Sequence, residues 1–385
     1  MQAGALAAVW QRYRGLIAGA AALAVCLAVL AVLYGGGDEE EPREPRAGAP
    51  PGFLGMVAED AFARPGAYRS RSLDRVREAG AGLVRQTFDW TLIEHSPGRY
   101  YFPYYDRFVA ALAERGLRLL PILFNPPPFR SSAPPRARRR GTYPPRRFAD
   151  LGAFGAVLAR RYGPGGSFWR SRPRLPQLPV RSWQIWNEPN VPVYWPPGPD
   201  AAAYARLLRV TGQAIKRVDP GAEIVTAGLA ESELGVPLQS YLEGMYEAGA
   251  AGTFDVLALN PFAPDARGVL GVVHAARRVS AAHGDATPVW ITEFGWATGG
   301  PPSAFRVGEG EQADLIEETL VELASRRREL QLRGVIYFNW RDSLPYQGGR
   351  DFFGLHTGLL RRSGSAKPAL DSYRRVAESL NASPG

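Results

Sequence analysis

Two glutamates follow short apolar segments that are rich in tryptophan. Glu188 stands in the segment WQIWNEPN, and Glu293 stands in VWITEFGW. A single glutamate in such a place could cap a helix or pair with an arginine. Two carboxyl groups that converge can instead divide the work of a reaction, one as a proton donor and the other as a base or nucleophile. The pair is the first candidate for chemistry, provided that the fold brings both residues to one place.

The chain after residue 50 alternates short strand-like runs with longer helical patterns. The apolar, β-rich runs are Phe53–Ala58, Gly82–Phe88, Leu117–Phe124, Ser182–Trp186, Glu223–Ala227, Phe254–Leu259, Pro288–Thr292 and Gly334–Phe338. The helical patterns include Tyr104–Arg115, Phe148–Tyr162, Ala201–Val218, Leu238–Ala248, Gly268–Ala282 and Glu311–Arg327. Alternating strands and helices predict an α/β fold with a parallel sheet, and eight repeats predict a (β/α)8, or TIM, barrel. An open doubly wound sheet is the alternative, but LGMVAEDAF after the first strand is not the glycine-rich phosphate loop that such a sheet usually carries.

A barrel also predicts where functional side chains should lie, because active sites of this fold lie at the carboxyl ends of the strands. Polar and aromatic residues directly follow the predicted strands. They are Arg85, Gln86, Asp89, Trp90, Asn125, Asn187, Glu188, Asn260, Glu293 and residues 339–342. Glu188 follows the fourth run and Glu293 the seventh, so a barrel would bring both carboxyl groups to the same mouth.

The two glutamate motifs resemble the signature of glycoside hydrolase clan A, with Trp-Asn-Glu-Pro on the fourth strand and Thr-Glu-Phe-Gly on the seventh. The segments TFDWTLIEHSPGRYYFPYYDRFV (87–109), RYGPGGSFW (161–169) and GLLRRSGSAKPA (358–369) are similar to further parts of the clan's pattern. The resemblance covers residues 51–380 and favours families 39 and 5, with family 42 as an alternative. It implies a retaining glycoside hydrolase that cleaves β-linked sugars through two carboxylates.

The resemblance implies a role for each matching residue. Glu188 would be the general acid/base and Glu293 the nucleophile. Asn187 would hydrogen-bond the sugar 2-hydroxyl, an interaction that strengthens in the transition state. Arg85 would keep Glu293 ionised, since a nearby cation lowers a carboxyl pKa. Trp340 would form the floor of the subsite that holds the cleaved sugar.

One position departs from the clan's pattern. Many members carry His-x-Tyr after the sixth strand, and the tyrosine hydroxyl contacts the nucleophile, whereas this chain has Asn-Pro-Phe at residues 260–262. Phe262 cannot donate that hydrogen bond. Either Tyr337 substitutes for the missing tyrosine, or Arg85 alone holds Glu293.

Aromatic residues after the strands are candidates for sugar contacts, because the C–H faces of sugars stack on aromatic rings. The candidates are Trp90, Tyr194, Trp195, Trp296 and Trp340, with Asn260 as a polar neighbour. Packing in the core is the alternative for each of these rings.

Two other functions would use the same region. A transglycosylase that remodels envelope polysaccharide would need the same two carboxylates. A catalytically silent, carbohydrate-binding envelope protein would be consistent with the missing tyrosine, but it would need neither glutamate. The sequence indicates neither the sugar nor the linkage, because these depend on loop lengths and a few hydroxyl contacts.

Composition narrows the list of partners. The net charge is +9, but only Lys216 and Lys367 are lysines, an arginine bias typical of a GC-rich genome. The basic run at 136–147 carries Tyr143 but no interleaved aromatic platform. It predicts a solvated loop, with an anionic ligand or envelope polymer as the alternative and no nucleic acid expected. The single cysteine, Cys26, permits no intramolecular disulfide, and the four histidines lack metal-ligand spacing. We therefore expect no metal and no cofactor, and the resemblance to the clan implies a carbohydrate partner.

The first fifty residues differ from the rest. Residues 15–34 carry no charge and are long enough to span a hydrocarbon core of ~30 Å at 1.5 Å per residue. Arg12 and Arg14 precede this segment and acidic residues follow it, which predicts a cytoplasmic N-terminus. We expect a cytoplasmic segment over 1–14, a transmembrane signal anchor over 15–34, a flexible linker over 35–50 and an extracellular catalytic domain over 51–380, as a monomer on the cell membrane. A cleaved signal peptide, which would give a secreted protein, is the alternative.

Overall fold

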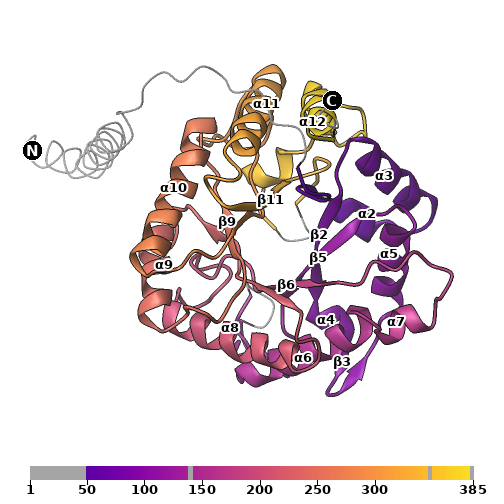
Figure 1. The fold of residues 1–385 in the computed structure, drawn as a ribbon, viewed down its shortest axis with the longest axis vertical. Helices are drawn as coiled ribbons and strands as arrows, with labels where there is room; N and C mark the ends of the chain where they lie inside the picture. Colours follow the sequence, from indigo (N-terminus) through magenta and orange to yellow (C-terminus); the bar gives the residue numbers. More distant parts are fainter. Residues whose placement is uncertain (1–48, 138–141, 346–348, 382–385) are drawn as a thin grey trace, which may run out of the picture. The chain divides into compact units, whose positions relative to one another are not determined.

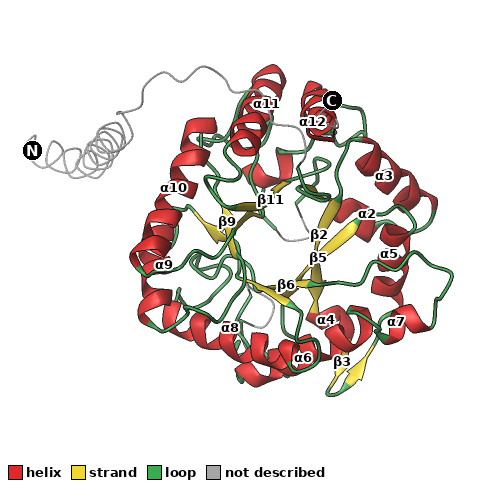
Figure 2. Ribbon diagram, viewed as in Figure 1, coloured by secondary structure: helices red, strands yellow, loops and turns green. Residues whose placement is uncertain are grey.

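A ring of strands surrounded by helices forms the body of the protein (Figures 1 and 2). The computed structural model describes residues 49–137, 142–345 and 349–381. The strands are β1 (Leu54–Val57), β2 (Leu83–Asp89), β3 (Glu94–Ser96), β4 (Arg99–Tyr100), β5 (Arg118–Phe124), β6 (Ser182–Ile185), β7 (Glu223–Val225), β8 (Leu229–Ala230), β9 (Leu257–Asn260), β10 (Val289–Ile291) and β11 (Leu332–Tyr337). The helices are α2 (Glu59–Ala63), α3 (Ala67–Glu78), α4 (Trp90–Ile93), α5 (Pro103–Ala113), α6 (Phe148–Tyr162), α7 (Ser167–Arg170), α8 (Ala201–Lys216), α9 (Leu238–Glu247), α10 (Ala266–Ala282), α11 (Glu309–Ser325), the 3₁₀ turn η1 (Phe353–His356) and α12 (Pro368–Asn381).

The large sheet is parallel and curls on itself. Within the described residues its strands pair in the order β7-β6-β5-β2-β1-β11-β10-β9-β8. Val225, at the end of β7, also bridges Val256 in parallel, and the backbone N–H of Thr226 donates to the carbonyl of Val256 at 3.0 Å. These contacts join the two ends of the sheet and close the ring. The short strands β7 and β8 together fill one of the eight strand positions. The fold is therefore TIM-barrel-like, and all eight predicted strand runs are confirmed.

The six predicted helices are also confirmed, as α5, α6, α8, α9, α10 and α11. The helices α3 and α12 and the antiparallel pair β3–β4 were not predicted. In α3 the sequence AYRSRSLDRVRE has few apolar residues, and Arg69 and Ser72 are buried beside Leu73 and Val76. Arg69 can be buried there because its Nε donates to the carbonyl of Ala61 at 2.9 Å. A hydrophobic pattern could not show this helix, since polar residues form half of its buried face.

The core has two layers, as expected when helices cover a closed sheet. One layer lies between the strands and the surrounding helices and holds most of the buried residues. The other is small and comes from strand residues and one neighbour of a strand. Its members are Val57, Leu83, Leu120, Val225, Val256, Ala258, Trp290 and Ile336, with Phe338 packed against them. We call this second layer the inner cluster.

The predictions for residues 1–14 and 15–34, and nearly all of the predicted linker, lie outside the described residues. Among the helices of the described part of the chain, none is long and apolar enough to cross a membrane. The anchor over residues 15–34 lies outside that part of the chain and stays a prediction.

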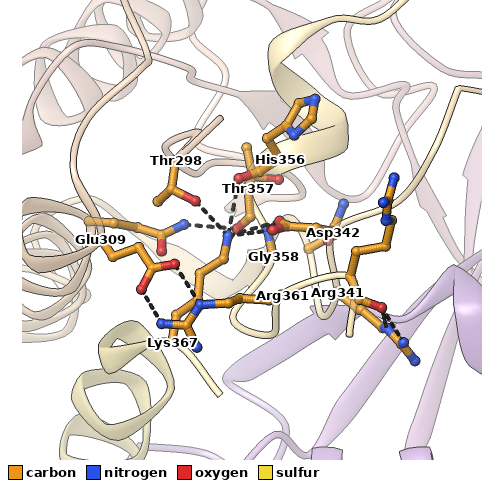
Figure 3. Close-up of polar contacts among 12 residues, drawn as sticks. Thr298, Glu309, Arg341, Asp342, His356, Thr357, Gly358, Arg361 and Lys367 are labelled. Carbon is orange, nitrogen blue, oxygen red and sulfur yellow. Dashed lines mark hydrogen bonds and ion pairs between the residues drawn. The ribbon is translucent and has the colours of Figure 1, made fainter. Parts of the chain in front are cut away.

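A buried lysine fixes the segment that follows β11 (Figure 3). The side chain of Lys367 is 1% exposed, and its Nζ donates to Thr298 Oγ1 at 2.8 Å, to Asp342 Oδ1 at 2.9 Å and to the carbonyl of His356 at 3.3 Å. Burial lowers the pKa of Lys367, whereas the Asp342 carboxylate raises it. Asp342 also accepts from the backbone N–H of Gly358 at 2.9 Å. Asp342 is thus a structural residue that holds the loop after β11 in place.

Breaking this ion pair should destabilise the fold strongly. We expect Lys367→Met to lower the free energy of unfolding by about 3–5 kcal/mol, because it leaves the half-buried Asp342 carboxylate without its cation and the partners of the Lys367 ammonium without their donor. The chain's other lysine provides a matched control, since Lys216 pairs with Asp255 at 2.7 Å with side chains 40% and 36% exposed. Lys216→Met should cost no more than about 1 kcal/mol. Denaturant unfolding measures both changes, and equal losses would contradict this account of Lys367.

Candidate active site

The predicted polar residues come together where four strands end. Arg85 lies in β2, Glu188 follows β6, Asn260 ends β9 and Glu293 follows β10. Direct hydrogen bonds and one ion pair connect these residues across the barrel mouth. The structure therefore joins residues that are more than 200 positions apart in the chain.

Arg85 lies at the centre of this network and is 2% exposed. Its Nε donates to Gln184 Oε1 at 2.7 Å, its Nη2 donates to Asn187 Oδ1 at 2.9 Å, and its Nη1 pairs with the Glu293 carboxylate. Gln184 is itself fixed, because its Nε2 donates to the carbonyl of Thr226 at 3.1 Å. Every nitrogen of the guanidinium thus has a protein partner. Arg85 holds Glu293 and Asn187 and does not reach into solvent.

Asn260 holds the other carboxyl group. Its Nδ2 donates to Glu188 Oε1 at 2.8 Å, and its Oδ1 accepts from Thr292 Oγ1 at 2.7 Å. The sequence suggested that Asn260 contacts a substrate. Asn260 is fully buried, so it positions Glu188 instead. Gly228 makes this arrangement possible, since a Cβ at residue 228 would lie 2.2 Å from Asn260 Oδ1 and 2.7 Å from Thr292 Oγ1.

The backbone that carries Glu188 is strained. Trp186 has a φ of 76° and Glu188 a φ of 39°, in the left-handed region that residues other than glycine rarely adopt. Each such residue costs about 1–3 kcal/mol and persists only where its surroundings hold it. Here the indole N–H of Trp186 donates to the carbonyl of Tyr194 at 2.8 Å, which ties the strand end to the loop that follows. Strained backbone is common at active sites, so this strain favours Glu188 as a candidate functional residue.

The two carboxyl groups have different electrostatic surroundings. Burial raises the pKa of Glu188 to about 8, and the charge of Glu293 contributes to the rise, while Asn260 and Arg85 oppose it. Burial also raises the pKa of Glu293, but the charge and the hydrogen bond of Arg85 act against that rise. Near neutral pH this arrangement favours a protonated Glu188 beside an arginine-bound Glu293. Such a division between two carboxyl groups separates an acid from a nucleophile or base.

Two further side chains complete the mouth. Asn187 is half-buried, and its Nδ2 has no hydrogen-bond partner within the described ranges, so it is available to a ligand. Tyr194 is also half-buried. Burial raises the pKa of its hydroxyl, and the charges of Glu188 and Glu293 raise it further, so Tyr194 lies within electrostatic range of both carboxyl groups. The sequence suggested Tyr194 only as a ring for sugar stacking.

Four tryptophans that were predicted to contact substrate lie in the core instead. Their exposed fractions are 1% for Trp90, 3% for Trp195, 0% for Trp296 and 1% for Trp340. The Trp90 ring stacks on Phe154 with centroids 5.0 Å apart, and the Trp195 ring packs edge-on against Trp186 at 5.6 Å. A buried indole ring removes a large apolar area from water, which explains why these rings turn away from the mouth.

Three of these indoles also have hydrogen-bond partners inside the protein. Trp90 Nε1 donates to the Glu94 carboxylate at 2.6 Å. Trp296 Nε1 donates to the carbonyl of Pro264 at 2.9 Å, and Trp340 Nε1 donates to Ser72 Oγ at 3.0 Å. The prediction that they line the substrate site is therefore corrected.

Phe338 is a second aromatic residue at the mouth, besides Tyr194. It is half-buried, it packs on the inner cluster, and its ring meets Phe262 edge-on with centroids 6.2 Å apart. The period-two pattern of β11 could have indicated this, because Ile336 faces the inside of the barrel and Phe338 is two residues further on.

Tyr337, the residue between them, points away from the inside of the barrel. It is fully buried, and its hydroxyl donates to the carbonyl of Thr357 at 2.8 Å, so it does not replace the missing tyrosine.

Within the described ranges, no group of three or more His, Cys, Asp or Glu side chains is placed to hold a metal ion. The arrangement as it stands is a pair of carboxyl groups, one positioned by an amide and one by a guanidinium.

Comparison with known proteins bears on the fold. No protein-family model matches the chain, and no curated protein matches it. Solved structures do match. A monomeric β-xylosidase from Caulobacter crescentus CB15 superimposes with a TM-score of 0.63 and 19% identity, covering 89% of this chain and 70% of that one. A family 39 enzyme from Xanthomonas axonopodis pv. citri gives a TM-score of 0.63 and 18% identity, covering 87% and 68%.

A family 39 glycoside hydrolase from Bacteroides cellulosilyticus WH2 gives a TM-score of 0.59 and 20% identity, covering 86% of this chain but 64% of that one. The chain thus spans slightly less than two thirds of the Bacteroides enzyme. At these identities the likeness establishes a shared fold.

Proposed function

We propose that this protein is a glycosidase in which Glu188 is the general acid/base and Glu293 the nucleophile. The observation that carries the proposal is the unequal environment of the two carboxyl groups. The pKa of Glu188 is raised to about 8, whereas Glu293 is bound by the Arg85 guanidinium. The same fold occurs in glycoside hydrolases, which supports the proposal.

The proposed reaction has two steps. Glu188 gives its proton to the glycosidic oxygen while a Glu293 oxygen attacks the anomeric carbon, so the bond to the leaving group breaks and a glycosyl ester forms. Glu188, now ionised, takes a proton from water as the water oxygen attacks the same carbon. The ester bond breaks, Glu293 is released as a carboxylate, and Glu188 is protonated again. Two displacements retain the anomeric configuration.

A mechanism-based inhibitor tests this proposal. The 2-fluorine of an activated 2-fluoro glycoside slows both steps, whereas its good leaving group speeds the first step alone, so the glycosyl ester should accumulate. We expect a mass increase equal to one fluoroglycosyl group, located by peptide mapping at Glu293. Glu293→Gln should gain no mass, and Glu378→Gln, at an exposed residue of α12, should behave like the unchanged protein. If active protein gains no mass with any of the fluorosugars tried, the double-displacement mechanism is rejected.

The substrate is proposed as a β-linked sugar. Structures with the same fold are described as a β-xylosidase, a glucosidase from Croceicoccus marinus, an exo-β-1,4-mannosidase and a β-galactosidase. A screen of aryl β-xyloside, β-glucoside, β-mannoside, β-galactoside and arabinoside would identify the glycone. A protein that binds these sugars but hydrolyses and transfers none of them would be a carbohydrate-binding protein instead.

We further propose that residues 15–34 tether the enzyme to the membrane, since this uncharged segment is long enough to span it. The full chain should remain in the membrane fraction after an alkaline carbonate wash. Release of the full chain by the wash, or recovery of a chain shortened at its N-terminus from the medium, would favour secretion.

A further inference from the structure

A cavity lies at the opposite end of the barrel from Glu188 and Glu293. It has a volume of about 290 Å³ and is lined by residues that precede β1 and by residues at or near the starts of β2, β5, β6 and β11. The amino ends of barrel strands ordinarily serve stability rather than chemistry. The side chains around this cavity do not fit a purely stabilising role.

Three arginines line the cavity, namely Arg118, Arg181 and Arg333. Arg333 pairs with Glu223 at 3.2 Å, and Arg181 lies 3.6 Å from Asp219. The side chain of Arg118 is exposed and has no acidic partner among the residues that the structure describes. The cavity therefore has one more cation than its neighbouring carboxylates balance.

Two buried donors at the cavity also lack acceptors. The side chain of Trp290 lines the cavity and is 4% exposed, and its indole N–H has no acceptor in the described part of the chain. The Nε–H of Arg333 is also buried and also lacks an acceptor among the described residues. The guanidinium carbon of Arg333 lies 5.8 Å from the centre of the Trp290 ring. Glu223 is already occupied, because its carboxylate accepts from Ser182 Oγ at 2.5 Å and from Arg333 Nη2. Leaving a buried donor unpaired costs about 1–3 kcal/mol, so an acceptor that entered here would recover part of that cost.

We propose that this cavity binds a phosphate-type oxyanion. Guanidinium groups present paired donors that match the oxygens of phosphate, and the charge of Arg118 attracts an anion from solution. Phosphate offers several acceptor oxygens, so one ion can face Arg118, Arg181 and the Trp290–Arg333 pair together. The cavity volume leaves room for a small alcohol esterified to the phosphate. The ligand is therefore either free phosphate or the phosphate group of an ester, such as a lipid headgroup.

This site is independent of the proposed glycosidase activity. Its residues lie at the amino ends of the strands, while the carboxyl pair lies at the carboxyl ends. A failure of either proposal would leave the other untouched.

The experiment titrates inorganic phosphate into the full chain labelled with ¹⁵N in its tryptophan indoles. The indole resonance of Trp290 is identified by its absence from Trp290→Phe. We expect this resonance to shift on addition of phosphate, and we expect Arg118→Gln and Arg181→Gln each to raise the Kd by about tenfold or more, as loss of a charged hydrogen bond should. Both arginines are exposed, so both variants should fold. Arg328→Gln, at an exposed arginine outside the cavity, should bind like the unchanged protein.

Two outcomes would overturn the proposal. One is a Trp290 resonance that phosphate leaves in place. The other is a Kd that rises equally in the cavity variants and in Arg328→Gln, or that rises in none of them. Parallel titrations with glycerol phosphate and with glycerophosphoglycerol, a soluble phosphodiester headgroup, separate the sources. Tighter binding of either ester than of phosphate, lost in Arg118→Gln, would assign the cavity to a phosphate ester, and tighter binding of inorganic phosphate would assign it to the free ion.

Discussion

Glu188→Gln should lower kcat/KM for glycosides with alkoxide leaving groups by about 10²–10⁴-fold, the usual contribution of a positioned general acid. The same variant should lose little kcat/KM on dinitrophenyl glycosides, because their leaving group departs without a proton. Its second step should be slow, since no base remains to activate water. Added azide needs no base and should restore turnover with a β-glycosyl azide as product. Initial rates on the two kinds of substrate measure the difference.

The pH dependence gives an independent readout of the same residue. Glu188 must be protonated to act, so kcat/KM of the unchanged protein should be constant between the pKa of Glu293 and that of Glu188, and it should fall as the pH rises through about 8. This alkaline fall should disappear in Glu188→Gln assayed on the dinitrophenyl substrate. Glu378→Gln should keep it. Equal losses of kcat/KM on both kinds of substrate in Glu188→Gln, or an alkaline fall that this variant keeps, would count against Glu188 as the acid.

Arg85→Met should also reduce activity severely, by about 10²–10³ in kcat, because it removes the cation that holds the nucleophile. The pKa of Glu293 is raised by burial and held down by Arg85, so loss of Arg85 should raise it further. Ionised Glu293 is required, and activity exists only above its pKa. The acid limb of the pH–rate profile should therefore move to higher pH.

A second variant separates charge from geometry. Arg85→Lys keeps the cation but cannot contact Gln184, Asn187 and Glu293 together, as the guanidinium does. We expect Arg85→Lys to keep the acid limb near its original pH while kcat falls. Arg328→Met should change neither quantity. Thermal unfolding of each variant checks that the protein is folded, and an acid limb that stays in place in Arg85→Met would contradict the proposed role.

Much of the barrel was predictable because its strands are short apolar runs between amphipathic helices. The period and order of those runs correspond directly to a parallel sheet covered by helices. The helix α3 could not be predicted in this way, because its buried face includes Arg69 and Ser72, and burial of Arg69 depends on a carbonyl supplied by α2. Contacts of that kind exist only after the elements have packed.

The candidate site was likewise predictable only in part. Residue type and position at strand ends indicated Arg85, Asn187, Asn260 and both glutamates, and the structure brings all five together. The prediction that the tryptophans contact substrate was wrong, because a position after a strand does not determine which way a side chain turns. Whether an indole faces the mouth or the core depends on its neighbours, such as Ser72 for Trp340 or Glu94 for Trp90, and these lie in other elements or on the far side of a turn.

Gly228 has a consequence for how mutational data on this protein would be interpreted. It carries no functional group, yet any side chain at residue 228 would collide with Asn260, which holds Glu188. A saturation scan scored by activity would therefore rank position 228 among the least tolerant in the chain, beside the glutamates themselves. The intolerance would arise from exclusion of volume and not from chemistry. Libraries designed to change substrate choice should hold residue 228 fixed and vary the loops around the mouth.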